Sequence, residues 1–190
     1  MKHALCQIAL HLRRRKDVKR STLFIFLTLF IMFVACQPKE EVNPDKLPTN
    51  YDYAAGDASK SVTLKGVTIQ VDETTTRPGN VSADQPLKPG YVYVVVKMTI
   101  TNQSQKSVLA TEFRLIDEYL NLYESWQTSA PFSRDLTALP AEIGPGQSAT
   151  GEQVFIVPQP ALSANLRLRW QSGVHESRID LSLGQLPMPQ

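Results

Sequence analysis

Few side chains of this sequence could form a catalytic or metal-binding constellation. It contains two cysteines, Cys6 and Cys36, and His175 is the only histidine that follows Cys36. One histidine provides neither a histidine-based triad nor a cluster of histidine ligands for a metal. We therefore expect His175 to be a hairpin-loop residue, and we expect no catalytic histidine site after Cys36.

Carboxylates are more plentiful, and Asp117, Glu118 and Glu124 lie close along the chain. Glycoside hydrolysis needs two carboxylates at a defined separation, and a calcium loop needs alternating oxygen ligands. Neither pattern is visible, so we interpret these residues as a solvated turn. Phosphate-binding glycine loops and GxSxG elbows are also missing from the sequence. The sequence thus predicts a non-enzyme with no metal and no cofactor, and a hydrolase would require two carboxylates that converge in one pocket.

The charge of the chain divides at Cys36. Seven basic residues and one acidic residue precede it, whereas thirteen basic and seventeen acidic residues follow it. The leader therefore carries a charge of +6 and the remainder a charge of −4. An acidic surface does not attract phosphates, so we do not expect the mature part to bind nucleic acid.

The basic leader continues directly into an apolar run, residues 23–35, that ends at Ala35. A basic region, an apolar region and a small residue at the boundary, in that order, are typical of a secretory signal peptide, here residues 1–35. About thirteen apolar residues are short for a membrane span, which needs roughly 20. The alternative is an uncleaved N-terminal anchor. Both interpretations place residues 37–190 outside the cytoplasm, because positive charge stays on the cytoplasmic side.

The stretch Phe33-Val34-Ala35-Cys36 resembles the lipobox of bacterial lipoproteins. That resemblance implies cleavage before Cys36, acylation of Cys36 and attachment of the protein to a bacterial membrane, with the protein facing the extracytoplasmic side. Gln37 is not the Asp that the family associates with inner-membrane retention, so the outer membrane is the expected destination if the cell has one. Cys6 would be removed with the leader, which leaves no disulfide in the mature part.

Residues 36–60 follow as a polar stretch with three prolines and no periodicity. We expect a flexible tether there, and a folded domain over residues 61–190. Within that domain the apolar residues recur with a period of two, most clearly over 91–101, and a turn or bulge is expected at Lys65-Gly66. The runs 166–171 and 178–183 predict a hairpin in which Arg167 lies opposite Asp180. Seven or eight short strands predict an all-β, immunoglobulin-like antiparallel β-sandwich.

Four segments in order resemble the telokin-like, immunoglobulin-like family catalogued as domain of unknown function 4352. They are a long strand that ends in Asn102, the strand EFRLID, the segment GPGQSATGEQVFIVP and the strand NLRLRW. The resemblance covers about residues 61–171. It implies a sandwich domain of a kind commonly found behind lipoprotein signals, and the family has no assigned reaction.

The stretch 125–148 is long for a connection between strands, and long connections are often functional. It carries Trp126, Phe132 and Leu136, which we take as a candidate binding loop. The alternative is a short helix near 133–139 that caps the sandwich and buries these groups. Our leading hypothesis is an envelope-anchored binding or interaction module whose partner, an envelope protein or ligand, is unknown. The second hypothesis is an inhibitor or regulator of an extracytoplasmic enzyme.

Overall fold

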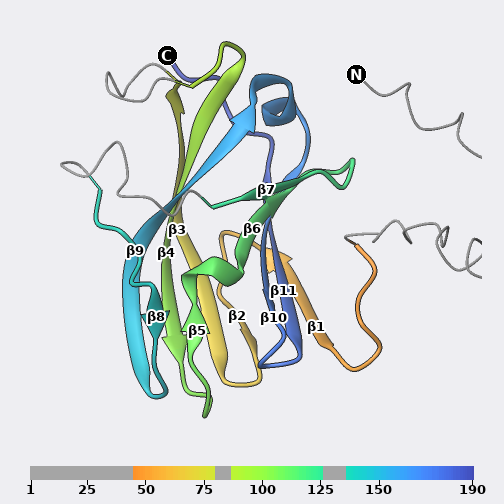
Figure 1. The fold of residues 1–190 in the computed structure, drawn as a ribbon, viewed down its shortest axis with the longest axis vertical. Coiled ribbons are helices and arrows are strands. Elements are labelled where there is room, and N and C mark those ends of the chain that lie inside the picture. Colours follow the sequence, from red (N-terminus) through yellow and green to blue (C-terminus); the bar gives the residue numbers. More distant parts are fainter. Residues whose placement is uncertain (1–44, 80–86, 126–135) are drawn as a thin grey trace, which may run out of the picture. The chain divides into compact units, whose positions relative to one another are not determined.

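Two packed β-sheets form the domain, as predicted for an immunoglobulin-like sandwich (Figure 1). The computed structural model describes residues 45–79, 87–125 and 136–190. The first sheet has the strand order β1-β11-β10-β6-β7, the second has the order β2-β3-β4-β9, and β5 pairs with β8. The elements are β1 (Asp52–Asp57), β2 (Val62–Leu64), β3 (Val67–Pro78), β4 (Tyr91–Asn102), β5 (Val108–Leu109), η1 (Ala110–Glu112), β6 (Phe113–Ile116), β7 (Leu122–Glu124), β8 (Glu142–Ile143), β9 (Gln147–Pro158), η2 (Gln159–Ser163), β10 (Leu166–Ser172) and β11 (Ser177–Gly184).

Strand β4 is the centre of the second sheet, and its prediction from alternating apolar residues is confirmed. It pairs with β3 on one side and with β9 on the other over most of its length. Its inward residues are fully buried between the sheets, because each alternate side chain of a strand points to the same face. These residues are Val92, Val94, Val96, Met98 and Ile100.

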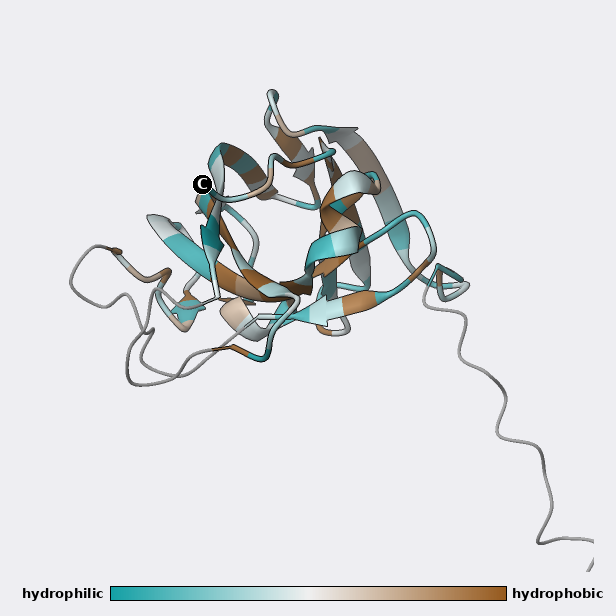
Figure 2. Ribbon diagram, turned by 90° about the horizontal axis from the view of Figure 1, so that it is seen from above, coloured by the Kyte–Doolittle hydropathy of each residue, from teal (hydrophilic) through white to brown (hydrophobic). Residues whose placement is uncertain are grey.

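Apolar side chains from both sheets fill the space between them, and Figure 2 shows hydrophobic and hydrophilic residues alternating along the strands. Phe155 of β9, Phe113 of β6 and Trp170 of β10 are the large aromatic members of this core. The indole Nε1 of Trp170 donates a hydrogen bond to Glu112 Oε2 at 2.9 Å, so the polar atom of this buried ring has a partner. Burial of this kind holds the fold without a disulfide.

A two-residue turn joins β2 to β3, where a turn or bulge was expected. Lys65 has a φ of 46° and Gly66 a φ of 80°. Two consecutive left-handed residues match the twist of the flanking strands in a tight hairpin. The phase of the apolar residues therefore changes at this turn because the chain reverses there.

The surroundings of Asn102, at the end of β4, give a physical reason why the long strand of the family pattern ends in Asn. The side chain is fully buried. Its Nδ2 donates to the carbonyl oxygens of Lys106 and Ile143 at 2.8 and 2.9 Å, and its Oδ1 accepts from the backbone and hydroxyl of Ser104. One amide thus connects β4, the following loop and β8.

The expected flexible tether over 36–60 is wrong for its described part. Residues 52–57 form β1, which pairs in parallel with β11, so the domain begins before residue 61. The close approach of β1 to β2 requires Gly56, because a Cβ at this position would overlap the side chain of Val62 in β2. The polar segment has no apolar period of its own, and only its pairing with a strand distant in sequence makes it a strand.

The hairpin of β10 and β11 was predicted, but its register was wrong. The loop comprises residues 173–176, and Glu176 adopts a left-handed φ of 48°. Arg169, and not Arg167, therefore lies opposite Asp180. Because the loop begins one residue later than expected, the partner of each β10 residue moves by two positions along β11, and Arg167 lies opposite Ser182.

Candidate functional site

The predicted lipidation site, Cys36, lies outside the described residues together with the leader and residues 37–44. Acylation therefore stays a prediction. Among the described residues no helix is both long enough and apolar enough to cross a bilayer.

The candidate binding loop is described only at its two ends. Trp126 and Phe132 lie outside the described residues, and Leu136 is described and half-buried. Leu136 packs against a small apolar cluster formed by Tyr93, Val95 and Val154 on the outer face of the second sheet. One predicted loop residue is thus attached to a rigid support.

Both ends of the loop are fixed to neighbouring positions of β9. Ser125 forms a β-bridge with Phe155, and Ala138 forms one with Glu152. The backbone N–H of Glu152 donates to Thr137 O at 2.8 Å, and that of Leu139 donates to Glu152 O at 3.0 Å. The two attachment points lie three residues apart on one strand, and loops whose ends lie close together, such as Ω-loops, are often functional.

The alternative of a short helix near 133–139 is wrong for residues 136–139, which are extended. Leu139 and Ile143 belong to the main core. Gly151 of β9 permits this, because a Cβ there would lie 2.5 Å from Leu139 Cα. This contact gives a physical reason for the last glycine of the segment GPGQSATG. The C-terminal part of the stretch 125–148 is therefore structural, and residues 126–137 contain its candidate functional part.

Tyr93 is fully buried, although its position on β4 assigns it to the outer face of the sheet. Leu87, Leu136 and Ile156 cover the cluster to which it belongs. Burial raises the pKa of the Tyr93 phenol. The signal in the sequence was the run VYVVV, which is apolar on both faces and indicates a strand covered on both sides.

A buried ionic cluster lies on the outer face of the first sheet, and sequence reasoning missed most of it. Arg169 donates from Nε and Nη2 to the two carboxylate oxygens of Asp180, both at 2.7 Å. Its Nη2 also contacts Asp45 Oδ1 at 2.7 Å, and Arg167 lies 3.5 Å from the same oxygen. The hydrogen bond from Arg169 is the main cause that lowers the pKa of Asp45.

Arg178 extends this cluster to the beginning of the described chain. Its Nη1 donates to Asp45 O at 3.0 Å, its Nη2 donates to Lys46 O at 3.3 Å, and its Nε donates to Gln171 Oε1 at 3.0 Å. Burial lowers the pKa of Arg178, with a further contribution from neighbouring Arg169. The cluster therefore fixes the segment that precedes β1 on the β10–β11 hairpin.

His175 lies in the hairpin loop as expected, but it is buried and hydrogen-bonded at both ring nitrogens. Nδ1 is 2.9 Å from Ser172 Oγ, and Nε2 is 3.0 Å from Ser104 Oγ. Ser104 Oγ also lies 2.6 Å from Asn102 Oδ1, an oxygen that can only accept. A second acceptor, Lys106 O, lies 2.9 Å from the same hydroxyl. The single Ser104 proton points to one of these two oxygens, so His175 Nε2–H donates to Ser104 Oγ and His175 does not act as its base. Burial lowers the pKa of His175.

The predicted solvated turn of carboxylates is wrong for Asp117, which is buried. Its oxygens accept from the backbone N–H groups of Tyr119 and Asn121, from Asn121 Nδ2 and from Tyr123 Oη, at 2.7 to 2.9 Å. Burial alone would raise the pKa of Asp117, but these hydrogen bonds outweigh it and lower the pKa. In contrast, Glu118 and Glu124 are exposed.

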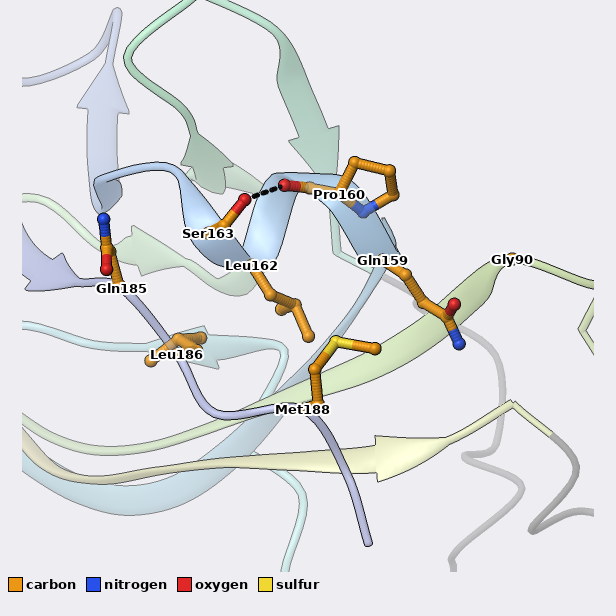
Figure 3. Close-up of a pocket in the computed structure, with 8 residues that line it drawn as sticks. All are labelled: Gly90, Gln159, Pro160, Leu162, Ser163, Gln185, Leu186 and Met188. Atoms are coloured by element: carbon orange, nitrogen blue, oxygen red, sulfur yellow. Dashed lines mark hydrogen bonds between the residues drawn. The ribbon is translucent and has the colours of Figure 1, made fainter.

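A shallow groove of about 540 Å³ lies between η2 and the C-terminal segment (Figure 3). Leu162, Leu186 and Met188 contribute apolar side chains, and Ser163 Oγ is occupied by a hydrogen bond to Pro160 O at 2.7 Å. The groove contains no ionisable side chain. It could accommodate a small apolar group, but it has no polar side chain arranged for chemistry.

Within residues 45–79, 87–125 and 136–190 no group of three His, Cys, Asp or Glu side chains could hold a metal ion.

Comparisons with known proteins identify a family but no activity. No curated protein matches the chain. Similar solved structures include the yjhA protein of Bacillus subtilis, with 14% identity and a TM-score of 0.47 over 66% of this chain and 99% of that one. The secreted protein MPT63 of Mycobacterium tuberculosis has 16% identity and a TM-score of 0.47 over 69% and 98% of the two chains. An uncharacterized β-sandwich protein of Clostridium difficile has 10% identity and a TM-score of 0.42 over 72% and 99%. The model of the family described as domain of unknown function (DUF4352) matches residues 57–177, and the chain belongs to this family.

Proposed function

We propose that this protein is a non-enzymatic lipoprotein of the bacterial cell envelope, anchored through Cys36, whose sandwich domain binds a partner outside the cytoplasm. The observation that carries the binding role is the attachment of both ends of the 126–137 segment to β9, at positions three residues apart. A rigid scaffold that fixes the ends of a loop reduces the ordering cost of binding. Trp126 and Phe132 lie within this segment and are residue types that often dominate binding interfaces.

The anchor is supported by the order of a basic run, an apolar run and Cys36. Acylation by more than one chain would make attachment stable, because each buried CH₂ contributes about 0.8 kcal/mol and a single chain holds only marginally. Metabolic labelling with radioactive fatty acid should mark the wild-type protein and not Cys36→Ser. If both proteins are labelled, or neither, the anchor is refuted.

Cross-linking in cells tests the binding role. The full-length protein should form a defined adduct with an envelope component, and the double variant Trp126→Ala/Phe132→Ala should lose it without a change in Tm. Val174→Ala, an exposed apolar position in the β10–β11 loop, is the matched control and should retain the adduct. Adducts that survive the double substitution would exclude this loop as the site.

The same experiment separates a binding module from a regulator of an enzyme. If the captured partner is an extracytoplasmic enzyme, its activity should be measured with and without the wild-type domain. Loss of that activity, restored by the double variant, would identify the protein as an inhibitor.

A further inference from the structure

The β6–β7 turn, residues 117–121, exposes apolar side chains at one end of the first sheet. Tyr119 is 74% exposed, and Leu122, the first residue of β7, is 44% exposed. Single exposed apolar residues are common on protein surfaces and need no explanation. Here the two residues lie three positions apart on one hairpin, and the structure of the turn is unusually well defined.

Buried Asp117 organises this turn. Its carboxylate accepts the backbone N–H groups of Tyr119 and Asn121, and Leu120 between them adopts a left-handed φ of 68°. A leucine in this conformation is a genuine outlier, and it persists only where the surrounding contacts impose it. The turn therefore presents Tyr119 in a preorganised form, so little conformational entropy would be lost when the turn meets another surface.

The turn lies close to the point where the described chain begins. Asp45 Oδ1 is 3.5 Å from Arg167 Nη2, and Arg167 lies opposite Ile116, the residue before Asp117. Asn165 Nδ2, at the start of β10, donates to Glu118 Oε2 in the turn at 2.8 Å. In Figure 1 the β6–β7 turn and the start of the orange segment at residue 45 lie on the same side of the domain.

Covalent geometry limits the distance between this side of the domain and the proposed anchor. Nine peptide steps separate Cys36 from Asp45. Fully extended, they span at most about 30 Å, whatever conformation they adopt. A domain of this size has a radius of gyration of about 15 Å. The chain between Cys36 and Asp45 is therefore no longer than the domain is wide, so the side that carries the β6–β7 turn stays within reach of the lipid.

We propose that the β6–β7 turn inserts Tyr119 and Leu122 into the headgroup region of the bilayer that holds Cys36, and so orients the domain on the membrane. This inference rests on the proposed anchor. A tyrosine is suited to this position because its ring is apolar and its hydroxyl is polar, and tyrosines are enriched at membrane–water interfaces. The anchor supplies the attachment, while the turn supplies a fixed orientation of the domain on the membrane.

Depth-dependent quenching tests the orientation on the full-length, lipidated protein. In the mature protein Cys6 is removed with the leader and Cys36 is acylated, so neither provides a free thiol. Tyr119→Cys should therefore introduce a single free thiol for a bimane label. The protein is reconstituted into vesicles of phosphatidylethanolamine and phosphatidylglycerol that contain brominated lipid. Leu122→Cys is the second labelled variant, and Val174→Cys, 54% exposed in the β10–β11 loop, is the control.

We expect brominated lipid to quench the label at positions 119 and 122 several-fold more than the label at position 174. Equal quenching at all three positions, in protein that floats with the vesicles, would overturn the membrane contact and leave the anchor intact. If the wild-type protein does not float with the vesicles, the anchor itself fails, and the contact fails with it.

Discussion

Two aspartates are equally buried in this domain, and they are stabilised in opposite ways. Asp180 is 3% exposed and pairs with the Arg169 guanidinium through two hydrogen bonds of 2.7 Å, whereas Asp117 is 2% exposed and accepts only from neutral donors within six residues. The Asp180 site joins β10, β11 and the segment before β1, so it depends on the tertiary fold. The Asp117 site is complete within one hairpin. Loss of a partner should therefore cost most at Asp180, where a buried charge would keep the more distant Arg167 Nη1, 3.6 Å away, as its counterion.

The largest expected effect comes from Arg169→Met. The substitution removes both short hydrogen bonds from the buried Asp180 carboxylate and leaves it the longer ion pair with Arg167 Nη1 at 3.6 Å. Breaking a buried pair in this way costs about 3 to 5 kcal/mol. Burial opposes the charged form of Arg169, but its hydrogen bonds to Asp180 and Asp45 outweigh that effect and raise its pKa. Urea unfolding at neutral pH measures the loss.

Arg114→Met is the matched control, because Arg114 is the neighbour of Arg169 on β6 and forms only a partly exposed pair with Glu124 at 3.7 Å. It should cost less than about 1 kcal/mol.

Adding Asp180→Leu to Arg169→Met should recover most of the stability, since apolar replacements of a buried pair are often neutral. If the double variant is no more stable than Arg169→Met alone, the cost does not arise from an unpaired charge.

Asp117→Asn should have a smaller effect, about 1 to 3 kcal/mol, because one acceptor oxygen becomes an amide that cannot accept from Asn121 or Tyr123. The change should appear as a lower midpoint in urea unfolding with an unchanged m-value. Glu118→Gln, at the exposed neighbouring position, should stay within about 0.5 kcal/mol of the wild type. A loss at Glu118→Gln as large as that at Asp117→Asn would show that burial does not distinguish the two carboxylates.

The pH dependence of stability sharpens the same comparison. The folded state lowers the pKa of Asp117, so its contribution is complete above the ordinary aspartate pKa and is lost as the pH falls below about 4. Asp117→Asn should therefore lose less stability than the wild type in this acid range. Burial also lowers the pKa of His175, so stability should begin to fall below about pH 6.5 in both proteins. A steeper acid loss in Asp117→Asn would contradict the assignment.

The parts of the fold that follow local patterns could be predicted from the sequence. Strand β4, the Lys65-Gly66 turn and the β10–β11 hairpin are encoded by residues close together along the chain. Strand β1 could not be predicted, because its polar segment becomes a strand only by pairing with β11, more than a hundred residues away. The predicted hairpin register was wrong by two positions, because the left-handed conformation of Glu176 gives no signal in the sequence.

The candidate site was predictable only in part. The length and apolar content of the 125–148 stretch indicated a long connection, and the role of Leu136 in binding stays a prediction. Leu139 and Ile143 belong to the core. Their segment can pass close to β9 only because Gly151 of β9 has no Cβ. The ionic cluster was missed because Asp45 lies in a stretch without periodicity, although Arg167, Arg169 and Arg178 were visible as alternating residues.

Apart from the control variants, the smallest expected effect is that of Tyr123→Phe, which removes one neutral donor from Asp117 and keeps the ring. Burial and the neighbouring Asp117 raise the pKa of Tyr123, so its hydroxyl remains protonated and donates to Oδ2 at 2.7 Å. The loss should be about 1 kcal/mol. In a double-mutant cycle with Asp117→Asn the two losses should not add, because both remove the same hydrogen bond. Additive losses would mean that the Tyr123 hydroxyl contributes to stability independently of the Asp117 carboxylate. The local network around Asp117 would then not be the unit that holds the β6–β7 turn.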